Sequence, residues 1–283
     1  MKNVIISKEE IGRGIFRFNI EEPLVASKHR PGQFIILMVN ETGERIPLTI
    51  AGSDPAAGTI TIVFQVAGKS TALLSSLEAG DRIQNLIGPL GRPTPIERYG
   101  RVACVIGGVG APYVYPILKA MRDAGNSISV FLGARSRELV IMEKELGEIS
   151  DTLSVSTDDD TYGYGGTVVD LFREALGSGG KFDMAVVVGP VGMMEAACAV
   201  TKEAGIRTMV SLNTIMVDGT GMCGSCRVTI GGESKLVCCD GPEFDGHLVD
   251  WAELRHRLGR FLDQEKVAMN LYKKSIFDRN GIK

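Results

Sequence analysis

The chain has 283 residues, and 31 Lys and Arg against 34 Asp and Glu give it a formal net charge of −3. This near balance argues against a nucleic-acid-binding protein, which usually carries a basic stripe. The N-terminus lacks the apolar core of a signal peptide, and no run approaches the roughly 18–20 apolar residues of a membrane span. We therefore expect a soluble, cytoplasmic protein with neither nucleic acid nor membrane as a partner.

Short apolar or alternating runs follow one another from residue 4 to about residue 96, separated by turns with Pro-Gly, Thr-Gly and Ala-Gly pairs. Runs at this spacing, without long helical segments, are typical of a small antiparallel barrel. Segment 44–50 places an arginine beside a proline and a β-type run. In segment 66–74, Gly-Lys-Ser-Thr precedes an apolar helix, so glycine amides, a cation and hydroxyls could meet a diphosphate. Taken separately, each segment also fits a plain barrel turn.

Strands alternate with helices after Pro95, a pattern that predicts a doubly wound parallel sheet. Segment 101–108 reads as a buried strand that ends in a glycine turn, and the turn Gly107–Pro112 opens a helix. Backbone amides of such a turn can approach a diphosphate. Segment 189–194, at the end of a later strand, would form the far wall of the same crevice. The alternative is that both are ordinary strand-to-helix turns.

Four of the six cysteines lie between Cys223 and Cys239, in a region too short for its own hydrophobic core. A metal would therefore have to organise this region. Cys223 and Cys226 form a C-x-x-C pair of soft thiolate ligands, which favours an iron–sulfur cluster. A zinc knuckle, a thioredoxin-like redox pair and free structural thiols remain as alternatives.

The other two cysteines and the three histidines are interpreted as structural. Cys104 and Cys198 lie in an apolar strand and an apolar helix, where a thiol behaves as a small hydrophobic group. His29, His247 and His256 are assigned to the surface or to structural roles, because the chemistry inferred below needs no general base.

A charged amphipathic helix is predicted from about residue 251 to residue 274. Four apolar residues recur on it at helical spacing, and these are Leu254, Leu258, Phe261 and Leu262. This stripe fits two roles equally well: an interface with a partner, or packing on the chain's own α/β domain.

The order of these motifs resembles the ferredoxin–NADP reductase superfamily over residues 4–250. The resemblance implies FAD in the barrel and NAD(H) against the α/β domain. The flavin motif would be Arg45, Pro47, Leu48 and Thr49, with the diphosphate loop Gly68, Lys69, Ser70 and Thr71. The nicotinamide site would comprise Gly107, Gly108, Val109, Gly110, Gly189 and Pro190.

Two branches of that superfamily add a C-terminal 2Fe-2S module. One is the electron-transfer subunit of dihydroorotate dehydrogenase, which normally supplies four cysteines. The other is the small subunit of NADH-dependent ferredoxin–NADP reductase, whose pattern this chain resembles. The resemblance assigns Cys223, Cys226 and Cys238 as cluster ligands, while Cys239 stands where the family has other residue types.

Asp218 is our candidate for the fourth ligand. It precedes Cys223 by five residues, across a glycine-containing turn that can return the carboxylate to the same iron. Cys239 is the competing candidate, but in an extended segment its side chain should diverge from that of Cys238. The alternative for Asp218 is that it caps the turn through backbone amides.

An acidic run, Asp158 to Asp160, follows the predicted third strand of the α/β domain. Carboxylates there can accept a hydrogen bond from a ribose 2′-OH and repel a 2′-phosphate, which favours NADH over NADPH. The alternative is a solvated acidic turn, since Arg135 and Arg137 could still reach a phosphate.

The expected architecture is β plus α/β: an N-terminal antiparallel barrel for FAD (1–97), a doubly wound NAD domain (98–216), an iron–sulfur module (217–250) and a C-terminal helix (251–283). The implied function is an oxidoreductase subunit that exchanges hydride between NAD(H) and FAD and single electrons with a 2Fe-2S cluster. Its partner would be a larger, glutamate-synthase-like subunit with its own flavin and iron–sulfur clusters, where electron bifurcation takes place. The alternatives are a dihydroorotate dehydrogenase subunit, a zinc-stabilised nucleotide-binding regulator and a self-sufficient diaphorase.

Overall fold

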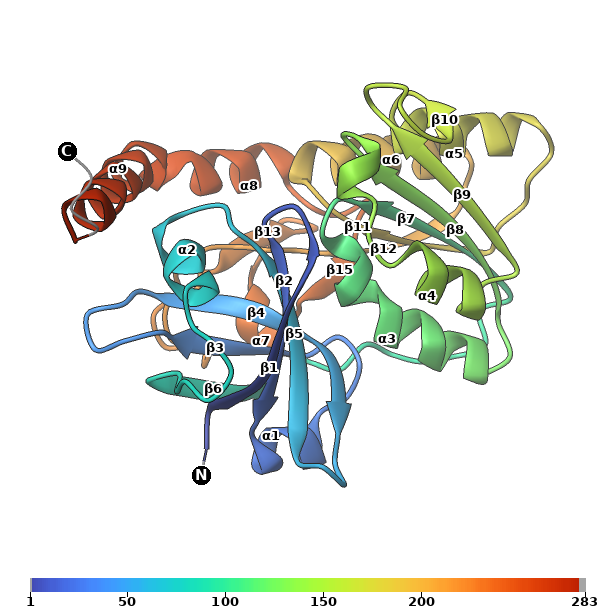
Figure 1. The fold of residues 1–283 in the computed structure, drawn as a ribbon. Coiled ribbons are helices and arrows are strands. Elements are labelled where there is room, and N and C mark those ends of the chain that lie inside the picture. Colours follow the sequence, from blue (N-terminus) through green and yellow to red (C-terminus); the bar gives the residue numbers. More distant parts are fainter. Residues whose placement is uncertain (1, 280–283) are drawn as a thin grey trace.

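The computed structural model describes residues 2–279, with side chains through residue 275. Its N-terminal part is an antiparallel barrel (Figure 1). Its strands lie in the order β1-β2-β5-β4-β3-β6. They are β1 (Val4–Gly12), β2 (Ile15–Glu21), β3 (Phe34–Met38), β4 (Arg45–Asp54), β5 (Thr59–Gln65) and β6 (Asn85–Leu90). The sheet closes where Ile5 N donates to Asp81 O and Ile83 N donates to Asn3 O, each at 2.9 Å. The predicted barrel is confirmed.

Buried apolar residues at every second position of the strands form the barrel core. Ile60, Ile62 and Phe64 of β5 point inward and are buried, and Phe64 meets Phe18 of β2 edge to face at 5.1 Å. Two short helices, α1 (Pro23–Lys28) and α2 (Lys69–Ser75), accompany the barrel, and Leu74 of α2 is fully buried in the same core.

The second sheet has the strand order β10-β9-β8-β7-β11-β12-β15, parallel except for β15. The parallel strands are β7 (Arg101–Gly107), β8 (Ser127–Ala134), β9 (Thr152–Thr157), β10 (Tyr164–Gly165), β11 (Met184–Val188) and β12 (Arg207–Ser211). Strands β8 to β10 lie on one side of β7 in the sheet, whereas β11 and β12 lie on its other side, so the strand order reverses between β7 and β11. Ligands of open α/β sheets bind beyond the carboxyl ends of the strands at such a point.

Helices cover both faces of this sheet, so the predicted doubly wound fold is confirmed. On one side lie α3 (Gly110–Asp123) and α4 (Glu143–Ile149), with the 3-10 turn η1 (Arg137–Leu139) before α4; on the other lie α5 (Val168–Gly177) and α6 (Val191–Glu203). In β7, Cys104 faces the α3 side and Val105 the α5 side, both fully buried. Cys198 of α6 is also buried, so both isolated cysteines are structural as predicted.

The cysteine region shares its core with the rest of the molecule. It contains a hairpin of β13 (Arg227–Ile230) and β14 (Glu233–Leu236), the helical turn α7 (Val237–Asp240) and β15 (Glu243–Asp245). Strand β15 pairs with β12 at the edge of the large sheet. Val228 and Val237 are buried in one cluster with Phe34 and Ile36 of barrel strand β3. Apolar packing therefore organises this region, in addition to any metal.

The predicted terminal helix is interrupted. It consists of α8 (Trp251–Leu258), the 3-10 turn η2 (Gly259–Phe261) and α9 (Leu262–Arg279). Leu254 is buried where α8 packs on α6, whereas Phe261 and Leu262 are about half exposed, at 49% and 52%. The apolar stripe thus divides between an internal and an exposed part, and α9 runs past barrel helix α2 (Figure 1). No helix within residues 2–279 is long and apolar enough to cross a membrane.

Candidate functional site

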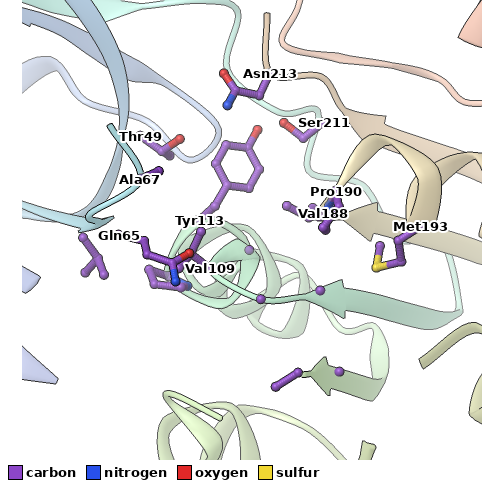
Figure 2. A pocket seen from close by; sticks show the side chains of 18 of the residues that line it. Thr49, Gln65, Ala67, Val109, Tyr113, Val188, Pro190, Met193, Ser211 and Asn213 are labelled. Atoms are coloured by element: carbon purple, nitrogen blue, oxygen red, sulfur yellow. The ribbon is translucent and has the colours of Figure 1, made fainter. Parts of the chain in front are cut away.

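A cavity of about 980 Å³ lies between the barrel and the carboxyl ends of β7 and β11 (Figure 2). Its position is the one expected for a ligand of a doubly wound sheet, and its volume is at the upper end of the ~300–1,000 Å³ usual for ligand pockets. The predicted residues that line it are Pro47, Leu48, Thr49, Thr71, Gly107, Gly108, Val109, Gly110, Asp158, Gly189 and Pro190. The predicted residues outside its lining are Arg45, Gly68, Lys69 and Ser70.

Strand β4 forms part of the barrel wall of the cavity, together with residues of β5. Its residues Pro47 to Thr49 pair with β3, so the predicted flavin motif is held by a regular ladder. Arg45, at the start of β4, is exposed. In the predicted diphosphate loop, Thr71 Oγ1 accepts from Gly68 N at 3.1 Å, and Ser70 Oγ donates to Glu44 Oε2 at 3.1 Å. The loop is therefore ordered by its own hydroxyl groups, and only Thr71 reaches the cavity.

The two glycine turns of the α/β domain meet in the opposite wall. A Cβ atom at Gly107 would lie 2.5 Å from Met193 Sδ, and one at Gly189 would lie 3.0 Å from Gly107 N. Gly108, by contrast, has a φ of +55° and open space where a Cβ would be. This combination of close packing and an open backbone at the start of α3 suits a nucleotide diphosphate.

The acidic run reaches the same cavity through one residue. Asp158 lines it together with Arg135 and Arg173, and the backbone N–H of Asp158 donates to Ala134 O at 3.0 Å. The next carboxylate, Asp159, is turned to its own loop, where it accepts from Thr161 Oγ1 at 2.6 Å. The structure thus separates Asp158 from its acidic neighbour.

Among the polar residues of the cavity that were not predicted are Tyr113, Ser211 and Asn213. Tyr113 stands in the first turn of α3, and in Figure 2 its hydroxyl points toward Ser211 and Asn213. It donates to the carboxylate Oε1 of Glu243, the first residue of β15. Burial raises the pKa of Glu243 to about 7 and raises the pKa of Tyr113 well above its usual value. Their only sequence signal was position: Tyr113 directly follows the predicted turn Gly107–Pro112, and Ser211 and Asn213 lie at the carboxyl end of a strand segment.

Three of the clustered thiols come together at the helical turn α7. Cys226 Sγ lies 3.3 Å from Cys238 Sγ, and Cys238 Sγ lies 3.6 Å from Cys239 Sγ. The expectation that Cys239 diverges from Cys238 assumed an extended segment, and that assumption is wrong because residues 237–240 are helical. Both sulfurs therefore face residues 218–226, which we call the cysteine loop.

Asp218 and Cys223 belong to the loop itself. The Asp218 carboxylate accepts from the amides of Thr220 and Cys223, each at 2.8 Å, and these bonds lower its pKa. Cys223 is exposed, and a hydrogen bond with Ser225 Oγ at 3.0 Å lowers the pKa of its thiol. Within the described residues, no group of three His, Cys, Asp or Glu side chains is arranged so that it could hold a single metal ion.

The loop nonetheless fits an iron–sulfur cluster in its chemistry. Gly219, Gly221 and Gly224 have φ values of +74°, +88° and +65°, a left-handed backbone that L side chains rarely adopt. A Cβ atom at Gly221 would lie 2.8 Å from Cys239 Sγ, so the backbone wraps closely around the thiols. Burial raises the pKa of Cys238, and its thiolate therefore needs a cationic centre beside it.

Comparisons with known proteins give family matches over the α/β domain and over the cysteine region. The family model for the iron–sulfur cluster binding domain of dihydroorotate dehydrogenase B matches residues 213–250, and that for the oxidoreductase NAD-binding domain matches residues 104–199. A Thermotoga maritima protein described as a homologue of the dihydroorotate dehydrogenase B (NAD⁺) electron transfer subunit is 47% identical over 96% of both chains. The Geobacillus thermodenitrificans electron transfer subunit is 31% identical over 85% of this chain and 94% of its own.

A solved structure agrees over nearly the whole length. It is a chain of the NADH-dependent reduced ferredoxin–NADP oxidoreductase, solved in a study of flavin-based electron bifurcation. The two chains share 45% identity with a TM-score of 0.90, over 96% of this chain and 98% of the other. The antiparallel barrel, the parallel sheet and the cysteine region are therefore arranged alike in both.

Proposed function

Because this chain belongs to the family of dihydroorotate dehydrogenase B electron transfer subunits and their homologues, we propose that it relays electrons between NAD(H), FAD and a 2Fe-2S cluster. It is an oxidoreductase subunit of the NADH-dependent ferredoxin–NADP reductase type. The observation that carries this is the single cavity between Pro47–Thr49 of the barrel and the glycine turns at Gly107 and Gly189. Strand β12, which contributes Ser211 to that cavity, leads directly into the cysteine region.

The three groups divide the chemistry: nicotinamide supplies hydride, flavin exchanges either hydride or single electrons, and a 2Fe-2S cluster exchanges single electrons. The chain's own residues bind and orient them. Pro47, Leu48 and Thr49 would hold the flavin ring against β4. The amides at Gly108 to Gly110, at the start of α3, would hold the nucleotide diphosphate. No side chain has to act as a nucleophile.

The cluster would be held by Cys223, Cys226 and Cys238 with Asp218 as the fourth ligand. This assignment is a proposal supported by the donor chemistry and by the closeness of Cys226 to Cys238. The capping bonds of Asp218 use one direction at each of its oxygens, and carboxylate oxygens retain further lone pairs for a metal.

A larger subunit would receive the electrons, and we propose that it is glutamate-synthase-like with its own flavin. The cysteine loop presents an exposed apolar rim to such a partner, with Met222 88% exposed beside the exposed Cys223. The half-exposed part of the terminal stripe, at Phe261 and Leu262, extends the apolar surface.

Anaerobic titration of the purified protein with NADH tests the proposed function. We expect a red-brown protein that contains FAD and iron, and bleaching of both the flavin and the cluster absorbance by NADH. A colourless protein with bound zinc would instead indicate the nucleotide-binding regulator. Purification from the native host then separates the two enzyme types: a co-purifying dihydroorotate dehydrogenase would favour the alternative subunit role.

A further inference from the structure

The proposed chemistry leaves a charge and a proton to be balanced in the cavity. A hydride carries two electrons and one proton, and the 2Fe-2S cluster removes the electrons singly. Each hydride that enters therefore adds one negative charge, and each electron pair that leaves releases one proton. An added charge at a buried site is unfavourable unless a nearby group compensates it.

We propose that the Tyr113–Glu243 pair compensates this charge: the Glu243 carboxylate takes up one proton when hydride enters the cavity and releases it when the electron pair leaves. This inference rests on the proposed function, because it presupposes FAD and hydride transfer in this cavity. Neither Tyr113 nor Glu243 belongs to a motif that the proposed function assigns to a cofactor.

The geometry places Glu243 directly behind Tyr113, which is part of the cavity wall. Tyr113 lines the cavity, and its hydroxyl points toward Ser211 and Asn213 (Figure 2). Glu243 accepts the hydrogen bond of that hydroxyl and lies opposite Ser211 in the β12–β15 pairing. The carboxyl therefore lies at the junction between the cavity and the cysteine region.

Glu243 is partly buried, and the groups nearest to its carboxyl are uncharged. Burial raises its pKa to about 7, and the hydrogen bond from Tyr113 lowers it by less. Gly32 packs close by, since a Cβ atom there would lie 3.2 Å from Glu243 Oε1. A carboxyl poised near neutrality changes its protonation in response to a modest additional charge, whereas Tyr113 keeps its proton because its own pKa is raised.

The charged side chains on neighbouring segments have other partners. Arg92 forms an ion pair with Asp240 at 3.3 Å. Asp245, two residues along β15, is exposed and accepts the amide of His247 at 2.9 Å. Within the described residues, Glu243 has no ion pair. An added negative charge in the cavity would thus act on Glu243 without a fixed counter-charge.

NADH becomes NAD⁺ as its hydride enters the cavity, and ionised Glu243 takes one proton from water, so the net charge of the site is unchanged. When two electrons leave singly through the cluster, the proton delivered with the hydride and the proton on Glu243 both return to water. No additional oxidant or reductant is required.

The test is the pH dependence of the flavin reduction potential in the FAD- and cluster-loaded protein, which gives the number of protons taken up per electron pair. Above about pH 7, where Glu243 is ionised before reduction, we expect a count that approaches two in the wild type. Glu243→Gln should reduce it to one over the same pH interval. Asp245→Asn, which removes a charge from the same strand, should keep the wild-type count.

Tyr113→Phe gives an independent measurement if Glu243→Gln does not fold. Loss of the Tyr113 hydrogen bond raises the pKa of Glu243 further, so the two-proton interval should begin at higher pH. An identical proton count in wild type and Glu243→Gln, or an unshifted interval in Tyr113→Phe, would overturn the inference. FAD and iron content are measured first, because their absence from the wild type would overturn the proposed function itself.

Discussion

Gly219 of the cysteine loop lies directly against Ile36 of barrel strand β3, where a Cβ atom at Gly219 would be 2.6 Å from Ile36 Cδ1. Ile36 pairs with Pro47 of β4, which lines the cavity. The cysteine loop is therefore one strand away from the proposed flavin wall. Electrons pass between protein-bound groups only at short range, so this contact fixes a distance on which the relay depends.

Gly219→Ala should displace the cysteine loop from the barrel. The added methyl group meets Ile36 in a packed core, which costs about 1–3 kcal/mol, and the left-handed backbone adds ~1–2 kcal/mol. Gly224→Ala is the matched control, because Gly224 has a φ of +65° but open space around its Cβ position. We expect slower reduction of the cluster by NADH in stopped-flow experiments for Gly219→Ala alone. Equal rates in the two variants would show that the contact does not set the electron-transfer distance.

The fold could be predicted because local sequence patterns indicate both sheets. Apolar and polar residues alternate along the barrel strands, and strands alternate with helices in the doubly wound part. Long-range relationships could not be predicted. Nothing in the sequence shows that β15 joins the edge of the large sheet, or that Tyr113 of α3 meets Glu243. Arg45 and Lys69 were assigned to FAD from their positions in the motifs. The structure leaves both residues outside the cavity lining.

Arg45→Ala tests whether an exposed arginine outside the cavity lining still holds FAD. A charged hydrogen bond to the flavin or its diphosphate contributes on the order of 1.5–3 kcal/mol, so its loss should weaken FAD binding about 10- to 150-fold. The measurement is the FAD content after gel filtration, with the iron content expected to stay at the wild-type level. Arg82→Ala serves as the control, because Arg82 is engaged elsewhere, with the Lys2 carbonyl. Full FAD occupancy in Arg45→Ala would remove Arg45 from the site.

Asp158→Ala should relax the preference for NADH. In the wild type, we expect NADH to be the better substrate, because a carboxylate in the cavity wall repels the 2′-phosphate of NADPH. Removing a like-charge repulsion of about 1 kcal/mol should improve kcat/KM for NADPH about fivefold relative to NADH. Asp159→Ala is the control, since that carboxylate is bonded to Thr161. Diaphorase assays with both nucleotides measure the ratio, and a wild-type preference for NADPH would contradict the prediction.

The stability of the protein should depend on pH through Glu243. Its folded pKa, raised to about 7 by burial, lies above its usual value of 4.5. The protonated form therefore stabilises the fold fully below pH 4.5, and this contribution is lost as the pH rises through 7. Glu243→Gln lacks this titration, so it should gain about 1–3 kcal/mol relative to wild type between pH ~5.5 and ~8. Thermal unfolding at both pH values measures the difference. Parallel pH profiles for the two proteins would show that Glu243 is ionised in the fold.

The ligand set of the cluster is the sharpest prediction, because the structure offers two candidates for the fourth ligand beside Cys223, Cys226 and Cys238. Cys239 is the closer thiol, with its Sγ 3.6 Å from Cys238 Sγ. Asp218 caps the loop, and the hydrogen bonds that lower its pKa keep it ionised, as a metal ligand must be.

We expect Asp218→Ala to lose iron and Asp218→Cys to keep a cluster with a shifted potential, because a thiolate is a softer donor than a carboxylate. Cys239→Ser should leave both the iron content and the EPR spectrum unchanged. Asp218→Asn separates the capping role from ligation, since its amide oxygen can still accept one of the two loop amides while the negative charge is gone. If Asp218 only caps the loop, Asp218→Asn would keep its iron with a wild-type spectrum. In that case, cluster loss in Cys239→Ser would identify Cys239 as the fourth ligand.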